Sequence, residues 1–290
     1  MKYHYFILLV MTALAASCED VIDIELPAAK PRVIVDALIR VDAIQEFLGV
    51  MAKAIATNNF FEEIPVTSLE SIIITTTVTR EDGPVLKTRA SSLIDIGPGS
   101  GIYTLNPNFS TEERSGTSAV LQDKDVLFAR IIGQKGRKYA AQARYAPVAP
   151  LIYVEQSTET LFSEDETEVL VAFEENPEID DFYIFDFDFG DFLVSEDTCY
   201  DEQEFKFSYF YDKSLDSGQD VTVSILGADS TFYNYTNQLI EQSEGPQSPL
   251  QTPAAAVRRN VFDITDMDNQ KVFDNVEQAD VFPMGYFAIV

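Results

Sequence analysis

Residues 32–41, RVIVDALIRV, alternate between two faces over ten positions. The first face is apolar and the second carries the charges: Val33, Val35, Ala37, Ile39 and Val41 against Arg32, Asp36 and Arg40. Because successive side chains of an extended chain point to opposite sides, this period of two predicts a β-strand that is buried on one face.

Further stretches in the first half have the same strand character, with turns between them. The strand-like stretches are 71–80, 102–105, 125–132 and 138–145, and the turns are EDGP at 81–84, GSG at 99–101 and GQKG at 133–136. The last turn predicts a hairpin, one face of which holds Tyr139, Ala141, Ala143 and Tyr145. At least five strands without a convincing helix predict an all-β fold, with an immunoglobulin- or transthyretin-like β-sandwich over residues 32–146.

The second half differs in composition and is predicted to be a second domain, 151–290. The connector PVAP at 147–150 is stiffened by two prolines and marks the boundary. Strand-like alternation recurs there at 167–174, 182–189, 205–211 and 221–225. Only residues 229–242 have helical spacing, with Asp229 or Ser230 available as the N-cap. We therefore expect a β-rich domain with one short helix.

Composition narrows the classes of function. The chain has 290 residues, 46% of them apolar, which allows a large core. Its net charge of −28 repels phosphate backbones, so nucleic acid is excluded as a partner. The only histidine is His4, so the rest of the chain lacks imidazole for catalytic triads and for zinc. Carboxylate or lysine chemistry remains open.

The N-terminal residues are typical of an export signal. Lys2 precedes an apolar run over 5–16, about twelve residues long and too short to span a bilayer comfortably. The run ends in LAASC at 14–18, which resembles a bacterial lipobox. We expect a signal peptide over 1–17, acylation of Cys18 with chains such as palmitate, and a lipidated acidic tether over 18–31. The alternative is an ordinary cleaved signal peptide with a buried cysteine.

The second cysteine, Cys199, has no disulfide partner in the chain once Cys18 carries lipid. We expect it to pack as a small apolar side chain or to be a free thiol, since no histidine is present to activate it as a nucleophile.

Two acidic clusters are candidate sites. In the first, DFDFGD at 186–191, the carboxylates of Asp186, Asp188 and Asp191 suit calcium, which prefers oxygen ligands. The spacing is not that of an EF-hand, and a strand would separate Asp186 from Asp188 by about 7 Å, so a solvated strand face is the favoured interpretation. The second cluster is equally weak: Asp263, Asp266, Asp268 and Asn269. Either could hold a glycosidase carboxylate pair, which sequence alone does not show.

Two aromatic runs in the second half have the period of a strand. They consist of Tyr183, Phe185, Phe187 and Phe189, and of Phe205, Phe207, Tyr209 and Tyr211. They could form a sugar-stacking platform, but the chain has no tryptophan and aromatic side chains are more often buried. Core packing is the favoured interpretation.

Short motifs in a fixed order carry a resemblance that spans nearly the whole chain. They are EDVID at 19–23 after the cysteine, PRVIVD at 31–36, EDG at 81–83, GIY at 101–103, GRKY at 136–139, Pro147 and Pro150, DFY at 181–183, NV at 260–261 and GYFA at 285–288. Together they resemble a family of Bacteroidota outer-membrane lipoproteins of unknown function, whose genes tend to lie beside those of TonB-dependent receptors. The chain departs from the family by lacking a glycine pair after residue 261 and by an acidic stretch over 263–280. The resemblance implies a β-rich exported lipoprotein and supplies no catalytic residues.

We therefore expect a lipid-anchored outer-membrane protein that faces the cell exterior, is not an enzyme and uses no metal or cofactor. Its expected role is to assist a TonB-dependent receptor in capturing or admitting a nutrient. The partners would be that receptor and the membrane lipid around the Cys18 anchor. A structural or adhesive envelope module is the first alternative, and a carboxylate-dependent hydrolase is the second.

Overall fold

The computed structural model describes most of the chain beyond residue 31. The described residues are 32–56, 69–79, 85–108, 114, 116–117, 126–132, 136–163, 165–174, 182–196, 204–211, 215, 218–244, 260–265 and 283–290. Contacts group residues 31–290 into a compact unit of its own. The predicted signal peptide, the tether, Cys18 and Cys199 lie outside the described residues.

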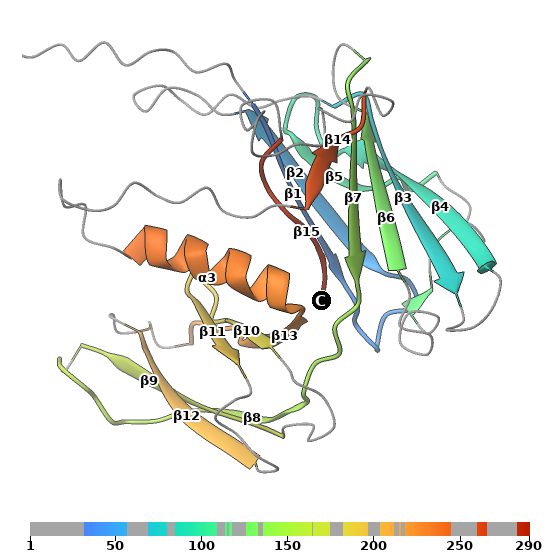
Figure 1. Cartoon of the computed structure of the whole chain (residues 1–290). Coiled ribbons are helices and arrows are strands. Elements are labelled where there is room, and N and C mark those ends of the chain that lie inside the picture. Colours follow the sequence, from blue (N-terminus) through green and yellow to red (C-terminus); the bar gives the residue numbers. More distant parts are fainter. Residues whose placement is uncertain are drawn as a thin grey trace, which may run out of the picture. The chain divides into compact units, whose positions relative to one another are not determined.

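Most strands join one large sheet (Figure 1). Its strands are β1 (Val33–Arg40), β2 (Gly49–Ala56), β3 (Ser71–Thr79), β4 (Val85–Asp95), β5 (Ile102–Leu105), β6 (Val126–Ile132), β7 (Lys138–Arg144), β14 (Val261–Asp263) and β15 (Phe287–Ile289). Over the described residues the strand order is β14-β7-β6-β3-β4-β5-β2-β1-β15. The predicted first strand and the hairpin are confirmed, because β6 and β7 pair antiparallel from Val126↔Arg144 to Ile132↔Lys138.

The pattern of burial in β1 follows the sequence period. Val35, Ala37 and Ile39 are buried, whereas Asp36 and Arg40 are exposed. The buried side chains of β1, β3, β7 and β15 belong to a single core, although β7 lies near one edge of the sheet order and β1 and β15 lie at the other. The sheet therefore curls around its own apolar face.

The predicted all-β class is confirmed, but the strands of residues 32–146 are arranged differently from a sandwich. A sandwich divides its strands between two facing sheets, whereas these strands are hydrogen-bonded edge to edge in one sheet. The curled sheet buries an apolar core as a sandwich does, because curling brings the apolar faces of distant strands together and excludes water from between them.

The described residues of the second half form two three-stranded sheets and a helix (Figure 1). The elements are β8 (Leu151–Gln156), β9 (Thr167–Glu174), β10 (Phe182–Asp186), β11 (Phe192–Glu196), β12 (Glu204–Tyr211), β13 (Ser224–Ala228) and α3 (Ser230–Glu244). One sheet has the order β11-β10-β13 and the other β12-β9-β8. Aromatic side chains fill the space between them, as in the contact of Phe173 with Phe185 at 5.6 Å between ring centroids.

The two aromatic runs are part of this core, as predicted. Tyr183, Phe185 and Phe187 of the first run are fully buried, and the second run packs against them. Phe187 and Tyr209 stack with ring centroids 3.8 Å apart. Phe189, the last member of the first run, is the exception: it is 42% exposed and lies outside this core.

The predicted helix is confirmed, together with its N-cap. Helix α3 begins at Ser230, and the Asp229 carboxylate accepts hydrogen bonds from the backbone N–H groups of Thr231 and Phe232, at 3.0 and 2.7 Å. A short polar side chain at this position satisfies N–H groups that have no partner within the helix. No helix among the described residues is long and apolar enough to cross a membrane.

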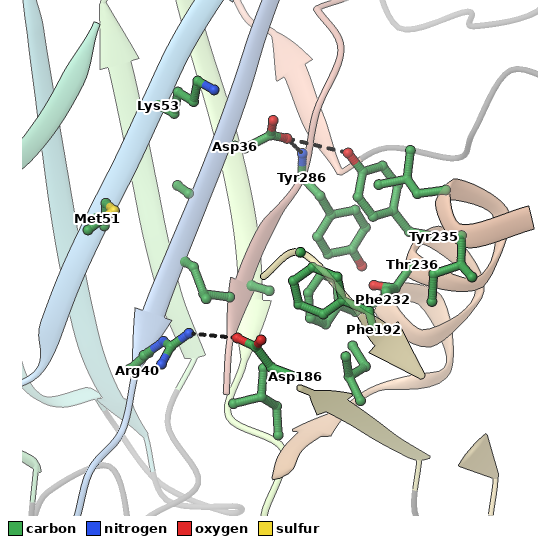
Figure 2. A pocket seen from close by; sticks show the side chains of 18 of the residues that line it. Asp36, Arg40, Met51, Lys53, Asp186, Phe192, Phe232, Tyr235, Thr236 and Tyr286 are labelled. Atoms are coloured by element: carbon green, nitrogen blue, oxygen red, sulfur yellow. Dashed lines mark hydrogen bonds and ion pairs between the residues drawn. The ribbon is translucent and has the colours of Figure 1, made fainter. Parts of the chain in front are cut away.

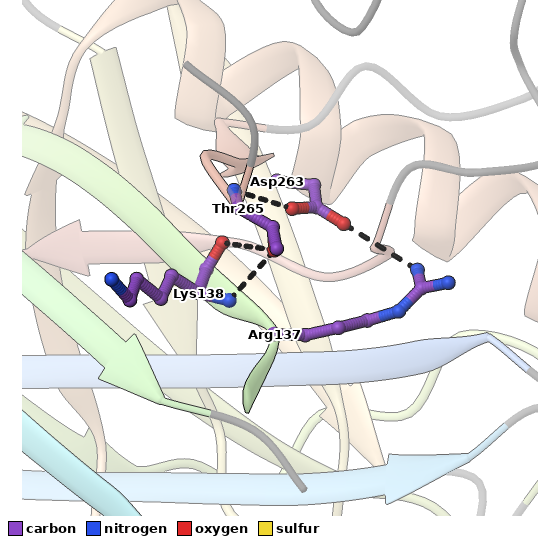
Figure 3. A network of polar contacts seen from close by, with 4 residues as sticks. All are labelled: Arg137, Lys138, Asp263 and Thr265. Carbon is purple, nitrogen blue, oxygen red and sulfur yellow. Dashed lines mark hydrogen bonds and ion pairs between the residues drawn. The ribbon is translucent and has the colours of Figure 1, made fainter. Parts of the chain in front are cut away.

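The last two strands return to the large sheet. β15 pairs parallel with β1, and β14 pairs antiparallel with β7. A polar network fastens β14 (Figure 3): Arg137 lies 3.4 Å from the buried Asp263 carboxylate, which also accepts a hydrogen bond from Thr265 N at 2.9 Å. The Thr265 hydroxyl in turn accepts a bond from Lys138 N at 2.8 Å.

The division of the chain at 147–150 into two domains stays a prediction.

Candidate functional site: an apolar cleft

A cleft of about 1160 Å³ lies between the outer face of the large sheet and the helix with its neighbouring hairpin (Figure 2). Strands β1 and β2 form one wall, α3 and the β10–β11 hairpin form the other, and β15 contributes the floor. This volume is slightly larger than the range of roughly 300–1,000 Å³ that is usual for small-molecule sites.

The sheet wall presents three cross-strand positions in succession. Asp36 lies opposite Lys53, Leu38 opposite Met51, and Arg40 opposite Gly49. These are the outward positions of β1 and β2, because their neighbours in sequence point into the core. The wall is therefore apolar in the middle and charged toward both ends.

The helix wall is an apolar stripe. Its members recur at the spacing of one helix face: Phe232, Tyr235, Thr236, Leu239, Ile240 and Ser243. Phe232 and Tyr235 pack on Tyr286 of the floor, with ring centroids 5.1 and 4.8 Å apart. Leu239 remains 43% exposed and Met51 on the opposite wall 63% exposed, so large apolar side chains face open space across the cleft.

The floor depends on a close approach of two backbones. At Gly285 a Cβ atom would lie 2.2 Å from the carbonyl oxygen of Val35 and 2.8 Å from Asp36 Oδ1, and the residue has a positive φ of 94°. Only glycine fits both conditions. The backbone can then form hydrogen bonds from Val35 N to Met284 O and from Ala37 N to Tyr286 O, both at 2.9 Å.

Asp36 is the acceptor at one end of the cleft. Its Oδ1 atom accepts bonds from Tyr286 N at 3.2 Å and from the Tyr235 hydroxyl at 3.3 Å (Figure 2). Water reaches the carboxylate inside the cleft, but the walls remove much of its hydration, and this burial raises its pKa above the usual value. The two hydrogen bonds and the nearby Lys53 charge act in the opposite direction. Burial and the adjacent Asp36 charge raise the pKa of Tyr235 as well.

The other end is closed by an ion pair between the walls. Arg40 Nη2 on β1 lies 3.5 Å from Asp186 Oδ2 at the end of β10 (Figure 2). The Asp186 side chain is largely buried and that of Arg40 is half exposed. An ion pair of this exposure contributes little stability, about 1 kcal/mol or less, so the contact mainly positions the two side chains.

The acidic run 186–191 is a turn, and the prediction of a strand through Phe189 is wrong. Strand β10 ends at Asp186, where the side chain accepts a bond from Asp188 N at 3.0 Å. Asp188, Phe189 and Gly190 all have positive φ, which reverses the chain, and Phe187 N bonds to Asp191 O at 2.9 Å. The predicted face of alternating carboxylates therefore does not form.

The Asp186 and Asp188 carboxylates accept hydrogen bonds from backbone N–H groups of the turn. The Asp188 carboxylate accepts bonds from Phe189 N at 2.9 Å and from Thr222 N at 3.5 Å. Within the described residues no group of three or more histidine, cysteine, aspartate or glutamate side chains is placed to hold a metal ion. In the second cluster, Asp263 holds the network of Figure 3, and Asp266, Asp268 and Asn269 lie outside the described residues.

The sequence analysis did not predict the cleft. A signal was present, because Leu38 interrupts the charged face of RVIVDALIRV between Asp36 and Arg40. Met51 is a second apolar side chain on an outward position. Neither is diagnostic alone, since single exposed apolar residues are common on protein surfaces.

Searches against protein-family models, curated proteins and solved structures found no match for this chain.

Proposed function

We propose that this chain is a lipid-anchored, non-enzymatic binding protein of the outer membrane, and that it captures a nutrient for a TonB-dependent receptor. The observation that carries the binding role is the cleft, whose walls are mostly apolar and whose sheet wall carries its charges toward the two ends. Such a concave, mostly apolar site is the usual form of a small-molecule site. The anchor and the receptor are proposed from the lipobox-like LAASC at 14–18 and from the family resemblance.

The anchor is tested by Cys18→Ser. Removal of the thiol removes the atom that receives lipid, so we expect loss of acyl labelling and recovery of the protein in the soluble or unprocessed fraction. Labelling with a palmitate analogue followed by mass spectrometry of the N-terminal peptide measures both. Acyl label that persists in the variant contradicts the anchor.

The receptor is tested by affinity isolation of the tagged, lipidated protein from outer membranes. We expect a single β-barrel receptor to be recovered in stoichiometric amount, and the Cys18→Ser variant serves as the control for membrane proximity. Repeated isolation without a barrel protein contradicts the role in transport. Growth on single nutrients, compared between a deletion strain and its parent, then identifies the class of nutrient.

An adhesive role is the second candidate, and one exposed loop favours it. Leu161 and Phe162 are 58% and 89% exposed, and their N–H groups bond to the Glu166 carboxylate at 2.6 and 2.9 Å. The loop is therefore built to present two large apolar side chains to solvent. Replacement of both by serine should abolish surface attachment if adhesion is the function, and should leave nutrient uptake unchanged.

The hydrolase alternative finds little support in the geometry of its candidate residues. Asp186 is paired with Arg40, and Asp188 is bonded to the backbone of the turn. We expect Asp186→Asn to leave any measurable turnover unaffected, because an aspartate committed to such contacts is poorly placed for proton transfer.

A further inference from the structure

The apolar centre of the cleft calls for an apolar occupant. Met51, Phe192, Leu193 and Leu239 line it and keep 63%, 40%, 38% and 43% of their surface exposed. Each square ångström of apolar surface removed from water stabilises a complex by about 25 cal/mol, so a hydrocarbon body that covers these side chains is favoured. A purely polar ligand would leave them in water and would strip its own polar groups of hydration.

The charges at the two ends are not equivalent. Asp36 is engaged by Tyr235 and Tyr286, and Asp186 is engaged by Arg40. The remaining cation is Lys53: among the described residues, no hydrogen bond or ion pair engages its ammonium group, although it lies near the Asp36 charge. An anion can therefore bind Lys53 without displacing an ion pair of the described residues, although the Asp36 carboxylate opposite Lys53 offsets part of its positive charge.

The opposite end is more negative, because both Asp186 and Asp191 line it together with the cation Arg40. Asp191 lines the cleft beside Phe192, which pairs with Asp186 at the end of β10. The positive position and the negative position are separated by the length of β1 from Asp36 to Arg40, four residues or about 13 Å. A molecule with one negative group is thus oriented by the cleft, with the negative group toward Lys53.

From these observations we infer that the cleft binds an amphipathic monoanion, a free molecule with a carboxylate or similar head at Lys53 and an apolar body of about 13 Å along β1 and β2. This inference rests on the proposed function and names the class of ligand. Because the whole chain carries a charge of −28, the preference for a negative ligand depends on Lys53 and on the smaller excess of negative charge at its end of the cleft.

The test uses three probes with one hydrocarbon body: decanoate, decanol and decylamine. They are titrated calorimetrically at pH 7.5 into a chain that begins at Glu19, which contains the whole compact unit 31–290 and needs no detergent. Decanoate is expected to bind at least tenfold more tightly than the alcohol or the amine. Equal or tighter binding of decylamine overturns the inference.

Variants assign the effect to the two parts of the site. Lys53→Gln is expected to remove the preference for decanoate over decanol, whereas Lys206→Gln, a lysine paired with Glu204 outside the cleft, preserves it. Met51→Gln is expected to weaken all three probes together. An unchanged decanoate affinity in either cleft variant, with unchanged melting of the protein, overturns the inference.

Chain length provides a further readout. From hexanoate to octanoate to decanoate the affinity should rise about fourfold for each added methylene, the ratio that burial of one CH₂ produces. The rise should stop when the apolar body becomes longer than the roughly 13 Å that β1 spans from Asp36 to Arg40. The protein is also sedimented with phosphatidylglycerol vesicles. If it binds the vesicles and shows no Lys53-dependent binding of decanoate, the inference is overturned in favour of a lipid surface.

The two proposals fail separately. If decanoate does not bind and the receptor is still isolated with the protein, the class of ligand is wrong and the role in transport stands. If decanoate binds through Lys53 and no receptor is isolated, the site stands and the role in transport is wrong.

Discussion

Asp36 is the residue in which fold and site meet. It occupies an outward position of the first predicted strand, and one of its oxygen atoms joins β15 to α3 through Tyr286 and Tyr235. The alternation of RVIVDALIRV predicts that Asp36 points away from the core. It does not predict the two donors, which come from residues about 200 and 250 positions later in the chain.

Asp36→Asn is expected to stabilise the protein at neutral pH. The folded state raises the pKa of Asp36, chiefly by burial, so the protonated form is favoured there. The stability that protonated Asp36 contributes is fully present below the pKa that Asp36 has in the unfolded chain. It is lost as the pH rises through the higher pKa that Asp36 has in the folded protein. Asparagine keeps the Oδ1 acceptor and carries no charge. Thermal unfolding should therefore show a higher Tm for the variant at pH 7 and equal Tm values at pH 3; a lower Tm at pH 7 contradicts this.

Tyr211, in contrast to Asp36, is a buried residue whose hydroxyl lies in the aromatic core. It donates a 2.6 Å hydrogen bond to the carbonyl oxygen of Phe187, and burial, with the nearby aspartates of the turn, raises its pKa to about 12. Tyr211→Phe leaves that carbonyl without its donor and should cost about 1 kcal/mol of unfolding free energy. The cost should shrink between pH 10 and 12, because the unfolded tyrosine ionises there and the folded one does not. Urea unfolding across that range measures both effects.

At the scale of elements, sequence periodicity was informative for long strands and for the helix. The sequence predicts β1, β3, β6, β7 and α3 with ends within a few residues, and it offers Asp229 or Ser230 as the cap, of which the structure selects Asp229. β14 and β15 have three residues each, too few to display a period. The sequence does not predict the β10–β11 turn, because two consecutive residues other than glycine, Asp188 and Phe189, adopt positive φ there, which is uncommon.

Gly285→Ala tests how β15 is held on β1. The new methyl group would lie 2.2 Å from a backbone oxygen, and the positive φ adds strain, so we expect a loss of roughly 3 kcal/mol or more. Gly99→Ala is the matched control: Gly99 also has a positive φ, 76°, but a Cβ there meets nothing within 4 Å. It should cost only about 1 kcal/mol. Equal losses in the two variants, measured by chemical denaturation, contradict the role of the close approach.

At the scale of the whole molecule, the cleft depends on residues from both halves of the chain. Its walls come from β1 and β2, from the β10–β11 hairpin and α3, and from β15. Each of these elements has an apolar outward position that sequence analysis can detect, such as Leu38. Their convergence depends on tertiary pairing, which local periodicity does not contain.

A chain that ends at residue 282 is expected to lose the cleft and the large sheet together. The deletion removes the floor of the cleft and exposes the edge of β1, whose N–H and C=O groups then lack partners. Buried residues of β15 also belong to the main core. We expect the shortened chain to show no cooperative unfolding transition when it is followed by near-ultraviolet circular dichroism. A transition like that of the full chain would contradict the conclusion that β15 is required for the large sheet.

The parallel pairing of β15 with β1 also has a consequence for biogenesis. During synthesis β15 is made some 250 residues after β1. The edge of β1 that pairs with β15 therefore has no partner strand until those residues have been added. Contacts at such sequence separation form slowly. The large sheet, and with it the floor of the cleft, therefore cannot be completed until residues 287–289 have been synthesised.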